Sequence, residues 1–378
     1  MIWKLAFGFV MSGAFHLYVW WRLAHGTYLP LRARRILGVV MVMMWCAIPI
    51  TTSARLWAPA FASTIGWVTL PWLAFVGLAS LALLVLELPR RALAPRGEAG
   101  LSRRQFLGRM AGGTAAVVGG TSVARGVLEA RGDHEVVDVE VPLAKLPKAL
   151  DGFTIVQLSD LHTGLTIDRA FVQRVVDHAN RLSPDLIALT GDLVDGPVDA
   201  LGDEVAPLGE LRAKHGVFAI TGNHEYYAGV NAWIAHISQL GIQYLRNARV
   251  AIGTGDATFD LAGVDDYSAA RYDGHGEDLP RALAGRDRSR ALVLLAHQPR
   301  QVKNAARYGV DLQLSGHTHG GQIWPWHYIA RIQQGGLLAG RYEHRGTQLY
   351  VTRGCGYWGP PVRLLAPLEI TRVILRAA

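Results

Sequence analysis

The chain has 378 residues, with 38 lysine and arginine residues against 30 aspartate and glutamate residues. This length predicts one large domain and an additional segment. The arginine excess is concentrated around apolar segments near the amino terminus, and no basic groove with interleaved aromatic residues follows, so membrane topology explains the charge better than nucleic-acid binding does. The two cysteines, Cys46 and Cys355, exclude a disulfide framework.

Apolar residues dominate the first part of the chain. Three runs, at residues 5–21, 36–50 and 65–86, are apolar enough to predict membrane-spanning helices. The third run has about 22 residues, or roughly 33 Å as a helix, which is long enough to span a bilayer. The two shorter runs have an alternative explanation as buried core helices or interfacial segments. Residues 1–100 are therefore predicted to be a transmembrane region with about three helices.

The arginines predict how these spans are oriented. The loop after the first run and the segment after the third are rich in arginine, whereas the second loop holds only Arg55. Because positively charged loops stay in the cytoplasm, those two segments should be cytoplasmic and the amino terminus should lie outside. The arginines concerned are Arg22, Arg32, Arg34, Arg35, Arg90, Arg91, Arg96, Arg103 and Arg104.

Residues 101–132 form a second segment, which resembles a twin-arginine export signal in an internal position. Arg103 and Arg104 are followed by a weakly apolar, glycine-rich run at residues 110–124, and then by a linker. If this run crosses the membrane as a fourth span, the rest of the chain lies on the extracytoplasmic face, which is our expectation. The alternative is a basic juxtamembrane patch with a flexible Gly/Ala linker, which would leave the rest of the chain inside.

A mixed, alternating pattern begins at about residue 133. Residues 136–141 alternate apolar and polar side chains and predict an edge strand. Asp168 predicts the N-cap of a helix with an apolar stripe that faces the core. The stripe consists of Phe171, Val172, Val175, Val176 and Ala179. Another helix is predicted over residues 230–240, ending at Gly241.

Five short apolar strands run directly into side chains of the types that bind metals. The strands are residues 153–158, 186–190, 217–221, 291–296 and 310–314. The candidate ligands that follow them are Asp160, His162, Asp192, Asn223, His297, His317 and His319. Because helices separate several strands, the pattern predicts α/β layering with these side chains converging at one edge of the sheet. In a continuing strand, His317 and His319 would point the same way.

The candidate ligands supply oxygen and nitrogen atoms but no thiolate. Such a set suits Mn, Fe, Zn or similar ions and does not suit a structural zinc site. The ligands are too many for one ion, so the pattern predicts two ions that share a carboxylate. Paired ions activate water and hold the oxygens of an in-line displacement.

The ordered motifs resemble those of the calcineurin-like metallophosphoesterases. They are Asp160-x-His162, Gly191-Asp192-x-x-Asp195, Gly222-Asn223-His224-Glu225, His297 and Gly316-His317-x-His319. The resemblance implies a catalytic domain over residues 133–378, built as a sandwich of two mixed β-sheets flanked by helices and preceded by the all-helical transmembrane region. The closing strands, at residues 348–354 and 369–375, resemble a bacterial membrane-associated branch of the family.

The resemblance also implies a role for each motif residue. One ion would be held by Asp160, His162, Asp192 and His319, and the other by Asp192, Asn223, His297 and His317. The two ions would be divalent or trivalent, of the Mn, Fe or Zn class, with Asp192 as the bridge. His224 would bind no metal and would instead stabilise the transition state or protonate the leaving oxygen. Asp195 would hold the motif loop or a ligand in place.

Two further motifs have ordinary explanations. The acidic turn at residues 263–267, which contains Asp265 and Asp266, is more typical of a loop than of a substrate contact. The Ile-Trp-Pro-Trp stretch at residues 323–326 either shapes a pocket, touches lipid or packs in the core. The histidines outside the strand ends are predicted to be surface or structural residues. They are His178, His215, His236, His275, His327 and His344.

The expected function is metal-dependent hydrolysis of phosphodiester or phosphomonoester bonds by a multi-pass protein of the bacterial cell membrane. Its partners would be the membrane and a phosphate-ester substrate, such as a lipid or cell-envelope phosphate, and no nucleic acid is expected. One alternative is a membrane scaffold or receptor that keeps a metal-stabilised phosphoesterase fold without turnover, against which His224 argues because the fold alone does not require it. Another is a transporter, against which the scarcity of ionisable residues in the spans argues.

Overall fold

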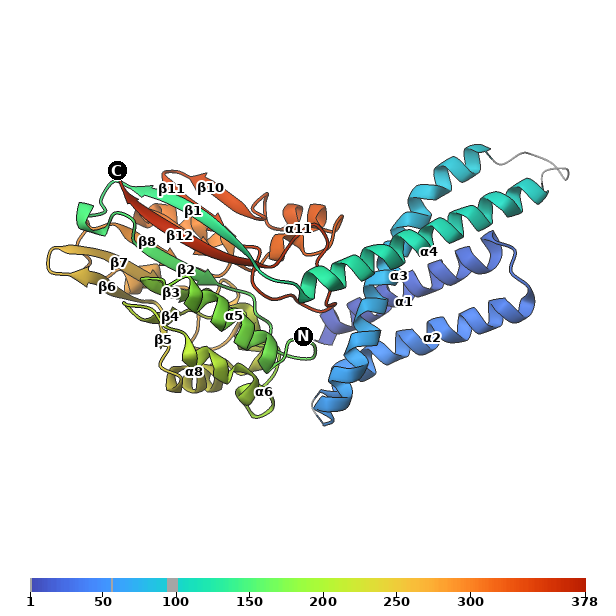
Figure 1. Cartoon of the computed structure of the whole chain (residues 1–378), viewed down its shortest axis with the longest axis horizontal. Helices are drawn as coiled ribbons and strands as arrows, with labels where there is room; N and C mark the ends of the chain where they lie inside the picture. The colour runs from blue at the N-terminus through green and yellow to red at the C-terminus, as the bar shows by residue number, and fades with distance from the viewer. Residues whose placement is uncertain (1, 56, 94–100) are drawn as a thin grey trace. The chain divides into compact units, whose positions relative to one another are not determined.

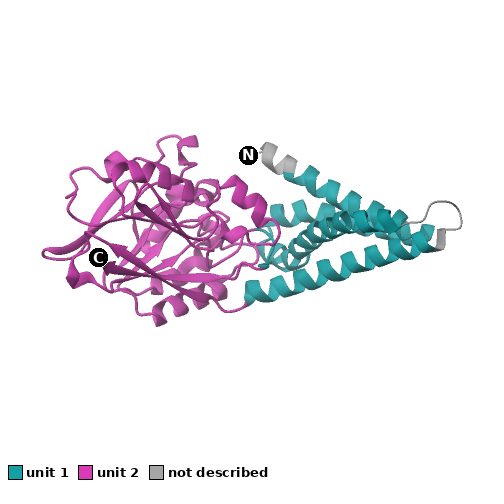
Figure 2. Ribbon diagram, turned by 90° about the horizontal axis from the view of Figure 1, so that it is seen from above, with its two compact units in different colours: residues 1–131, 359–364 teal, residues 132–358, 365–378 magenta. Residues whose placement is uncertain are grey.

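The computed structural model describes residues 2–55, 57–93 and 101–378. The chain divides into two compact units, which Figure 2 colours separately. Unit 1 comprises Met1–Arg131 and Gly359–Leu364, and unit 2 comprises Gly132–Trp358 and Leu365–Ala378. The predicted segment boundary at residue 100 and the topology residue Arg96 lie outside the described residues.

Four helices are described in unit 1, and Figure 1 labels them α1 to α4. They are α1 (Ile2–Gly26), α2 (Leu31–Ala54), α3 (Pro59–Leu93) and α4 (Leu101–Arg131). In the described part of the chain, α2 and α3 are the helices long and apolar enough to cross a membrane. They contain the predicted spans at residues 36–50 and 65–86, whereas the predicted span at residues 5–21 lies in α1 and remains a prediction.

The segment that resembles an export signal is a continuous helix, α4, so the structure differs from a flexible Gly/Ala linker. Its glycines allow close packing. A Cβ on Gly108 would lie 1.7 Å from the carbonyl oxygen of Gly26 in α1, and one on Gly119 would lie 3.2 Å from the Phe75 ring in α3. The buried core of this unit draws on all four helices. It consists of Val19, Met41, Val76, Ala79, Leu83 and Ala115.

Unit 2 is a sandwich of two mixed β-sheets with flanking helices, as the resemblance implied (Figure 1). The first sheet has the order β1-β12-β2-β3-β4-β5 and the second β10-β11-β9-β8-β7-β6. The strands of the first are β1 (Glu135–Leu143), β2 (Thr154–Leu158), β3 (Leu186–Leu189), β4 (Val217–Ala219), β5 (Gln243–Tyr244) and β12 (Glu369–Ala377). Those of the second are β6 (Ala248–Thr254), β7 (Ala257–Gly263), β8 (Leu292–Leu295), β9 (Leu312–Ser315), β10 (Gly340–His344) and β11 (Thr347–Val351).

The α-helices of unit 2 are short. They are α5 (Arg169–Arg181), α6 (Val198–Val205), α7 (Asn223–Ala228), α8 (Val230–Gln239), α9 (Leu279–Ala282), α10 (Val302–Ala305) and α11 (His327–Gln333). The Asp168 side chain caps α5 by accepting a hydrogen bond from the Phe171 backbone N–H at 2.9 Å, and the predicted stripe of α5 is buried. The helix α8 ends as predicted before Gly241, whose φ of 86° suits glycine.

The hydrophobic core of unit 2 lies between the two sheets. It includes Ile155 and Leu186 from the first sheet and Leu261 and Val293 from the second, all with 0 % exposure. The central strands β3 and β8 are buried on both faces, which explains why they appear as continuous apolar runs in the sequence. The edge strand β1 alternates between exposed and buried residues, as predicted for residues 136–141.

Candidate metal centre

The five strands β2, β3, β4, β8 and β9 end at one side of the sandwich and carry the predicted ligands there. The strands belong to two sheets, so the expectation of a single sheet edge is wrong. Hydrogen bonds join the two sheets at this side. The Gln157 amide donates to the Ser315 carbonyl at 3.1 Å, and His297 Nδ1 donates to the Thr190 carbonyl at 2.8 Å.

Three overlapping groups of side chains could hold metal ions. They are Asp160, His162 and His319; His162, Asp192 and His224; and Asp192, His297 and His317. Within each group the potential ligand atoms lie within 4.8 Å of one another. Because His162 and Asp192 each belong to two groups, the three form one continuous cluster. Asn223 joins it next to His224, whose backbone N–H donates to Asp192 Oδ1 at 2.8 Å.

Within these groups, imidazole nitrogens and carboxylate oxygens from different strand ends lie close to one another. Nε2 of His162 lies 3.1 Å from Nε2 of His319, which in turn lies 3.7 Å from Asp160 Oδ1. Nε2 of His297 lies 3.1 Å from Asp192 Oδ2. Since Nδ1 of His297 donates to a backbone carbonyl, its Nε2 is the nitrogen that faces the cluster and would bind an ion.

The backbone reaches these positions through left-handed turns. Asp160, His162, Asp192, His317 and His319 all have positive φ, between 52° and 74°. His317 and His319 therefore do not continue β9 as extended residues, and the expectation that their rings point the same way is wrong. The turns direct the two rings into different groups, His317 beside His297 and His319 beside His162. Left-handed residues other than glycine cost free energy and cluster at functional sites.

Glycines in two of the motifs make room for the carboxylates. A Cβ on Gly222 would lie 2.2 Å from Asp192 Oδ1, and one on Gly316 would lie 2.2 Å from Asp160 Oδ2. The His317 backbone N–H donates to both oxygens of Asp160, at 2.8 and 3.0 Å. The motif glycines therefore allow backbone and carboxylate to approach closely.

Burial and neighbouring charges together shift the pKa values of residues in the cluster. Burial alone would raise the pKa of Asp192, but the neighbouring His297 and His224 hold it well below its usual range. Burial, with the nearby His297, lowers the pKa of His317 to about 3, so this ring is neutral and has a lone pair to donate at neutral pH. The anionic Asp192 carboxylate beside the neutral His317 ring is a suitable environment for a cation.

Buried polar atoms that lack a partner in the protein test whether these residues fit metal ions. Asn223 Oδ1 and His317 Nδ1 are buried and have no hydrogen-bond partner within the described ranges, and buried His297 Nε2 faces the Asp192 carboxylate at 3.1 Å. A buried polar atom without a partner costs free energy, so it is rare in a folded protein. All three belong to residues predicted to hold the same ion, and oxygen and imidazole nitrogen are suitable ligands for Mn, Fe or Zn. The residues present therefore fit the predicted metals.

His224 lies at the exposed side of the cluster. Its Nδ1 is 2.6 Å from Asp195 Oδ1, which also lies 2.8 Å from His162 Nδ1. Burial alone would lower the pKa of His224, but the carboxylates of Asp192 and Asp195 outweigh it and raise the pKa to about 9. The rings of Tyr227 and Trp358 lie 5.1 and 5.9 Å from the His224 ring, between centroids, and both are about half exposed.

Two features of the site were missed by sequence reasoning. The buried Glu225 carboxylate accepts hydrogen bonds from the backbone N–H groups of Gly222, Asp192 and Leu193 at 2.6 to 3.0 Å, and so joins two motif loops. Its position three residues after Gly222, at the start of a helix, is typical of a capping box and was the available signal. Trp358 gave no such signal, because it stands far from every motif in the sequence.

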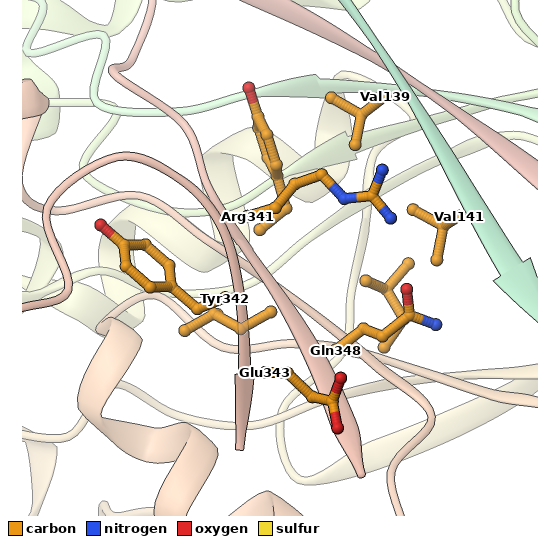
Figure 3. Close-up of a pocket in the computed structure, with 9 residues that line it drawn as sticks. Val139, Val141, Arg341, Tyr342, Glu343 and Gln348 are labelled. Atoms are coloured by element: carbon orange, nitrogen blue, oxygen red, sulfur yellow. The ribbon is translucent and has the colours of Figure 1, made fainter.

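The acidic turn is structural, as expected for a loop. Asp265 pairs with Arg246 at 2.7 and 2.9 Å, and Asp266 accepts hydrogen bonds from Ser268 and Gln298. A surface pocket of about 310 Å³ lies elsewhere on unit 2, where β1 faces β10 and β11 (Figure 3). It is lined by Val139, Val141, Leu312, Arg341, Tyr342, Glu343, Gln348, Leu349 and Tyr350. The predicted ligands do not line it, so it is separate from the metal centre.

The sequence of this chain is similar to a protein-family model and to several known proteins. The model of the calcineurin-like phosphoesterases matches residues 153–321. A transmembrane protein with a metallophosphoesterase domain from Danio rerio is 40% identical over 264 residues, which cover 67% of this chain and 60% of the relative. Its counterpart from Bos taurus is 43% identical over 265 residues, with the same coverage. The uncharacterized metallophosphoesterase YkuE of Bacillus subtilis is 34% identical over 290 residues, which cover 73% of this chain and 98% of the relative.

Proposed function

Because the chain belongs to the calcineurin-like phosphoesterase family, we propose that it is a membrane-anchored, metal-dependent hydrolase of phosphoric esters. The matched region spans about 60% of the length of the two vertebrate transmembrane relatives. The observation that carries the proposal is the continuous cluster of aspartate and histidine side chains with His224 at its exposed side. The substrate is a phosphodiester or phosphomonoester, and we favour a lipid or cell-envelope phosphate because the chain contains apolar helices long enough to span a membrane.

Two ions fit the ligand set. Asp160, His162 and His319 would hold one, and Asn223, His297 and His317 the other, with Asp192 between them. When bound, ions of the Mn, Fe or Zn class supply an activated water and neutralise charge on the phosphoryl oxygens. The left-handed turns and the close contacts at the motif glycines hold the ligand side chains in position.

His224 is the proton donor in this proposal. Its raised pKa, about 9, keeps the ring protonated at neutral pH, and its Nδ1 is engaged by Asp195. Nε2 is then left to donate a proton to the oxygen of the leaving group. Tyr227 and Trp358 beside the ring would exclude water from one side of that transfer.

Asp195 is a positioning residue. It contacts both His162 and His224, so a single carboxylate orients a metal ligand and the proton donor. A carboxylate behind a ligating histidine fixes its tautomer and makes the other ring nitrogen a better ligand. Asp195 therefore couples the position of the metal centre to that of the acid.

We also propose that the protein is a multi-pass protein of the bacterial cell membrane, in a membrane-associated branch of the family, with unit 2 on the extracytoplasmic face. The similarity to transmembrane relatives and the apolar helices α2 and α3 support membrane anchoring. The pair Arg103 and Arg104 before the glycine-rich part of α4 supports export by a twin-arginine signal.

The test uses the full-length protein in detergent. Metal is removed with a chelator and Mn, Zn or Mg is added back, and hydrolysis of bis-p-nitrophenyl phosphate and p-nitrophenyl phosphate is followed. Metal-dependent turnover that is lost in Asp192→Asn is the expected result. A folded protein that binds two ions and hydrolyses neither compound would favour the scaffold or receptor alternative.

A further inference from the structure

The helix α11, labelled in Figure 1, leaves an apolar face uncovered. Tyr328, Ile329 and Ile332 are 58%, 53% and 79% exposed, and Trp324 just before the helix is 46% exposed. Ile332 follows Tyr328 by four residues and Ile329 by three, so these side chains share one face of the helix. We call Trp324, Tyr328, Ile329 and Ile332 the α11 ridge. The exposure of Trp324 argues against core packing of the Ile-Trp-Pro-Trp stretch.

Contacts on the other side hold the ridge in position. A Cβ on Gly321 would lie 2.4 Å from His327 Cα, so the start of α11 packs directly on the loop that carries His319. At the end of the helix, Arg300 Nη2 donates to the Gln333 carbonyl at 3.1 Å. The apolar face is therefore presented outward by a fixed helix and does not belong to a loose loop.

The charge around the ridge suits an anionic surface. The sequence has no acidic residue between Asp311 and Glu343, and Arg331 in α11 is exposed. Trp, Tyr and Ile side chains beside arginine are typical of segments that lie in the membrane interface, where the apolar groups enter the headgroup region and arginine pairs with lipid phosphate. The chain also carries helices that are able to span a membrane, so a lipid surface is available to it.

The ridge lies on a segment that is joined to the mouth of the metal centre. The helix α11 follows the His319–Gly321 turn after five residues. Gln322 exchanges two hydrogen bonds with the backbone of Trp358, both at 2.9 Å, and the Trp358 ring flanks His224. A surface that binds the ridge is thereby brought near the side on which His224 is exposed.

We propose that the α11 ridge inserts into the headgroup region of the membrane that anchors the chain and presents the metal centre to phosphate groups at the lipid surface. Insertion of the ridge rests on the proposed function only because it requires a membrane-anchored protein. It does not require turnover. It commits to lipid as the occupant of the ridge, in preference to a second copy of the chain or a protein partner.

The test places a fluorophore on the ridge of the full-length protein in nanodiscs of phosphatidylcholine and phosphatidylglycerol. Ile332→Cys, in a Cys46→Ser background, is labelled with an environment-sensitive dye, and the buried Cys355 stays unlabelled. The matched control is Asp256→Cys in the exposed turn between β6 and β7, at the other end of unit 2 (Figure 1). An unchanged thermal unfolding midpoint verifies that both variants fold.

Because an interfacial helix places its apolar face about 5–10 Å into the headgroup boundary, nitroxide-labelled lipid should reduce the emission of the Ile332 label roughly twofold. Aqueous iodide should quench this label much less than the Asp256 label. Adding Ile329→Glu should restore quenching by iodide.

Three results would overturn the proposal. Quenching of both labels by iodide to the same extent would show that the ridge stays in water. Protection of the Ile332 label from iodide and from nitroxide lipid would show that protein covers it, as a second copy or a partner. Protein that does not migrate with the nanodiscs in a density gradient would refute the membrane anchoring itself, which distinguishes that failure from failure of the ridge.

Discussion

Asp195 Oδ1 lies 2.6 Å from Nδ1 of His224, and the same oxygen lies 2.8 Å from Nδ1 of His162. One carboxylate thus orients a residue at the metal centre and the residue that we propose as the acid. The rings of His162 and His224 meet edge to face, with centroids 4.5 Å apart. The position of the acid therefore depends on the same contacts that fix the metal ligands.

Replacing the acid should separate catalysis from metal binding. His224→Ala should lower kcat by about 10²–10⁴-fold, the usual contribution of a positioned acid, because no other group then protonates the leaving oxygen. Metal content, measured by elemental analysis, should stay close to that of the parent. His344→Ala, in the edge strand β10 and outside every candidate metal group, is the matched control and should change neither value. Loss of metal in His224→Ala would show that this residue is a ligand.

Asp195→Asn should affect the protein differently from His224→Ala. The amide keeps the shape of the side chain but cannot carry the negative charge that both histidines face, so we expect about a 10–100-fold loss of metal affinity or activity. Isothermal titration with Mn or Zn and the kcat of the metal-saturated variant separate the two effects. Asp199→Asn, at an exposed position in α6, is the control. An unchanged affinity together with an unchanged kcat would remove the positioning role.

Gly222→Ala should disrupt the centre without replacing a ligand. The added methyl group would meet Asp192 Oδ1 at 2.2 Å, and the φ of Gly222, −96°, is one that alanine accepts, so the effect arises from the clash alone. We expect destabilisation by about 1–3 kcal/mol, the range for an overpacked interior, and weaker metal binding. Gly209→Ala, whose nearest neighbour would be Leu240 Cβ at 3.5 Å, is the control in denaturant unfolding. Parent-like stability and metal binding in Gly222→Ala would contradict the packing argument.

The orientation of unit 2 is open to a reporter test. Alkaline phosphatase fused after Ala378 should be active in a bacterial host, because this enzyme matures only outside the cytoplasm. The double variant Arg103→Lys, Arg104→Lys should lower that activity, whereas Arg90→Lys, Arg91→Lys should not. A fluorescent cytoplasmic reporter at the same position and an inactive phosphatase would place unit 2 inside.

The strand pattern was sufficient to predict the residues that meet at one side of the domain, whereas the sandwich of two sheets was predicted by the resemblance of the motifs to a known family. Apolar strands such as β3 and β8 are buried on both faces, so they stand out from their surroundings, and each ends in a ligand type that a loop seldom needs. The cap formed by Asp168 is local and follows from the preference of a single residue.

Other features depend on contacts that a linear pattern does not contain. The left-handed φ of His317 goes with the hydrogen bonds that its backbone N–H donates to Asp160, which follows a strand far away in the sequence. Strand alternation was therefore the wrong basis for orienting their rings. The role of Glu225 depends on the contact between two loops. The position of Trp358 beside His224 depends on a contact between residues that are far apart in the sequence.

The central claim is that the cluster around Asp192 holds metal ions that turn over a phosphate ester. The most direct measurement is hydrolysis of bis-p-nitrophenyl phosphate by the full-length protein after chelation and after stepwise return of Mn, with Asp192→Asn beside it. The account predicts no turnover without metal, recovery that saturates near two ions per chain because the ligands fit two sites, and no recovery in the variant. Turnover that survives chelation, or that Asp192→Asn retains in full, would contradict it.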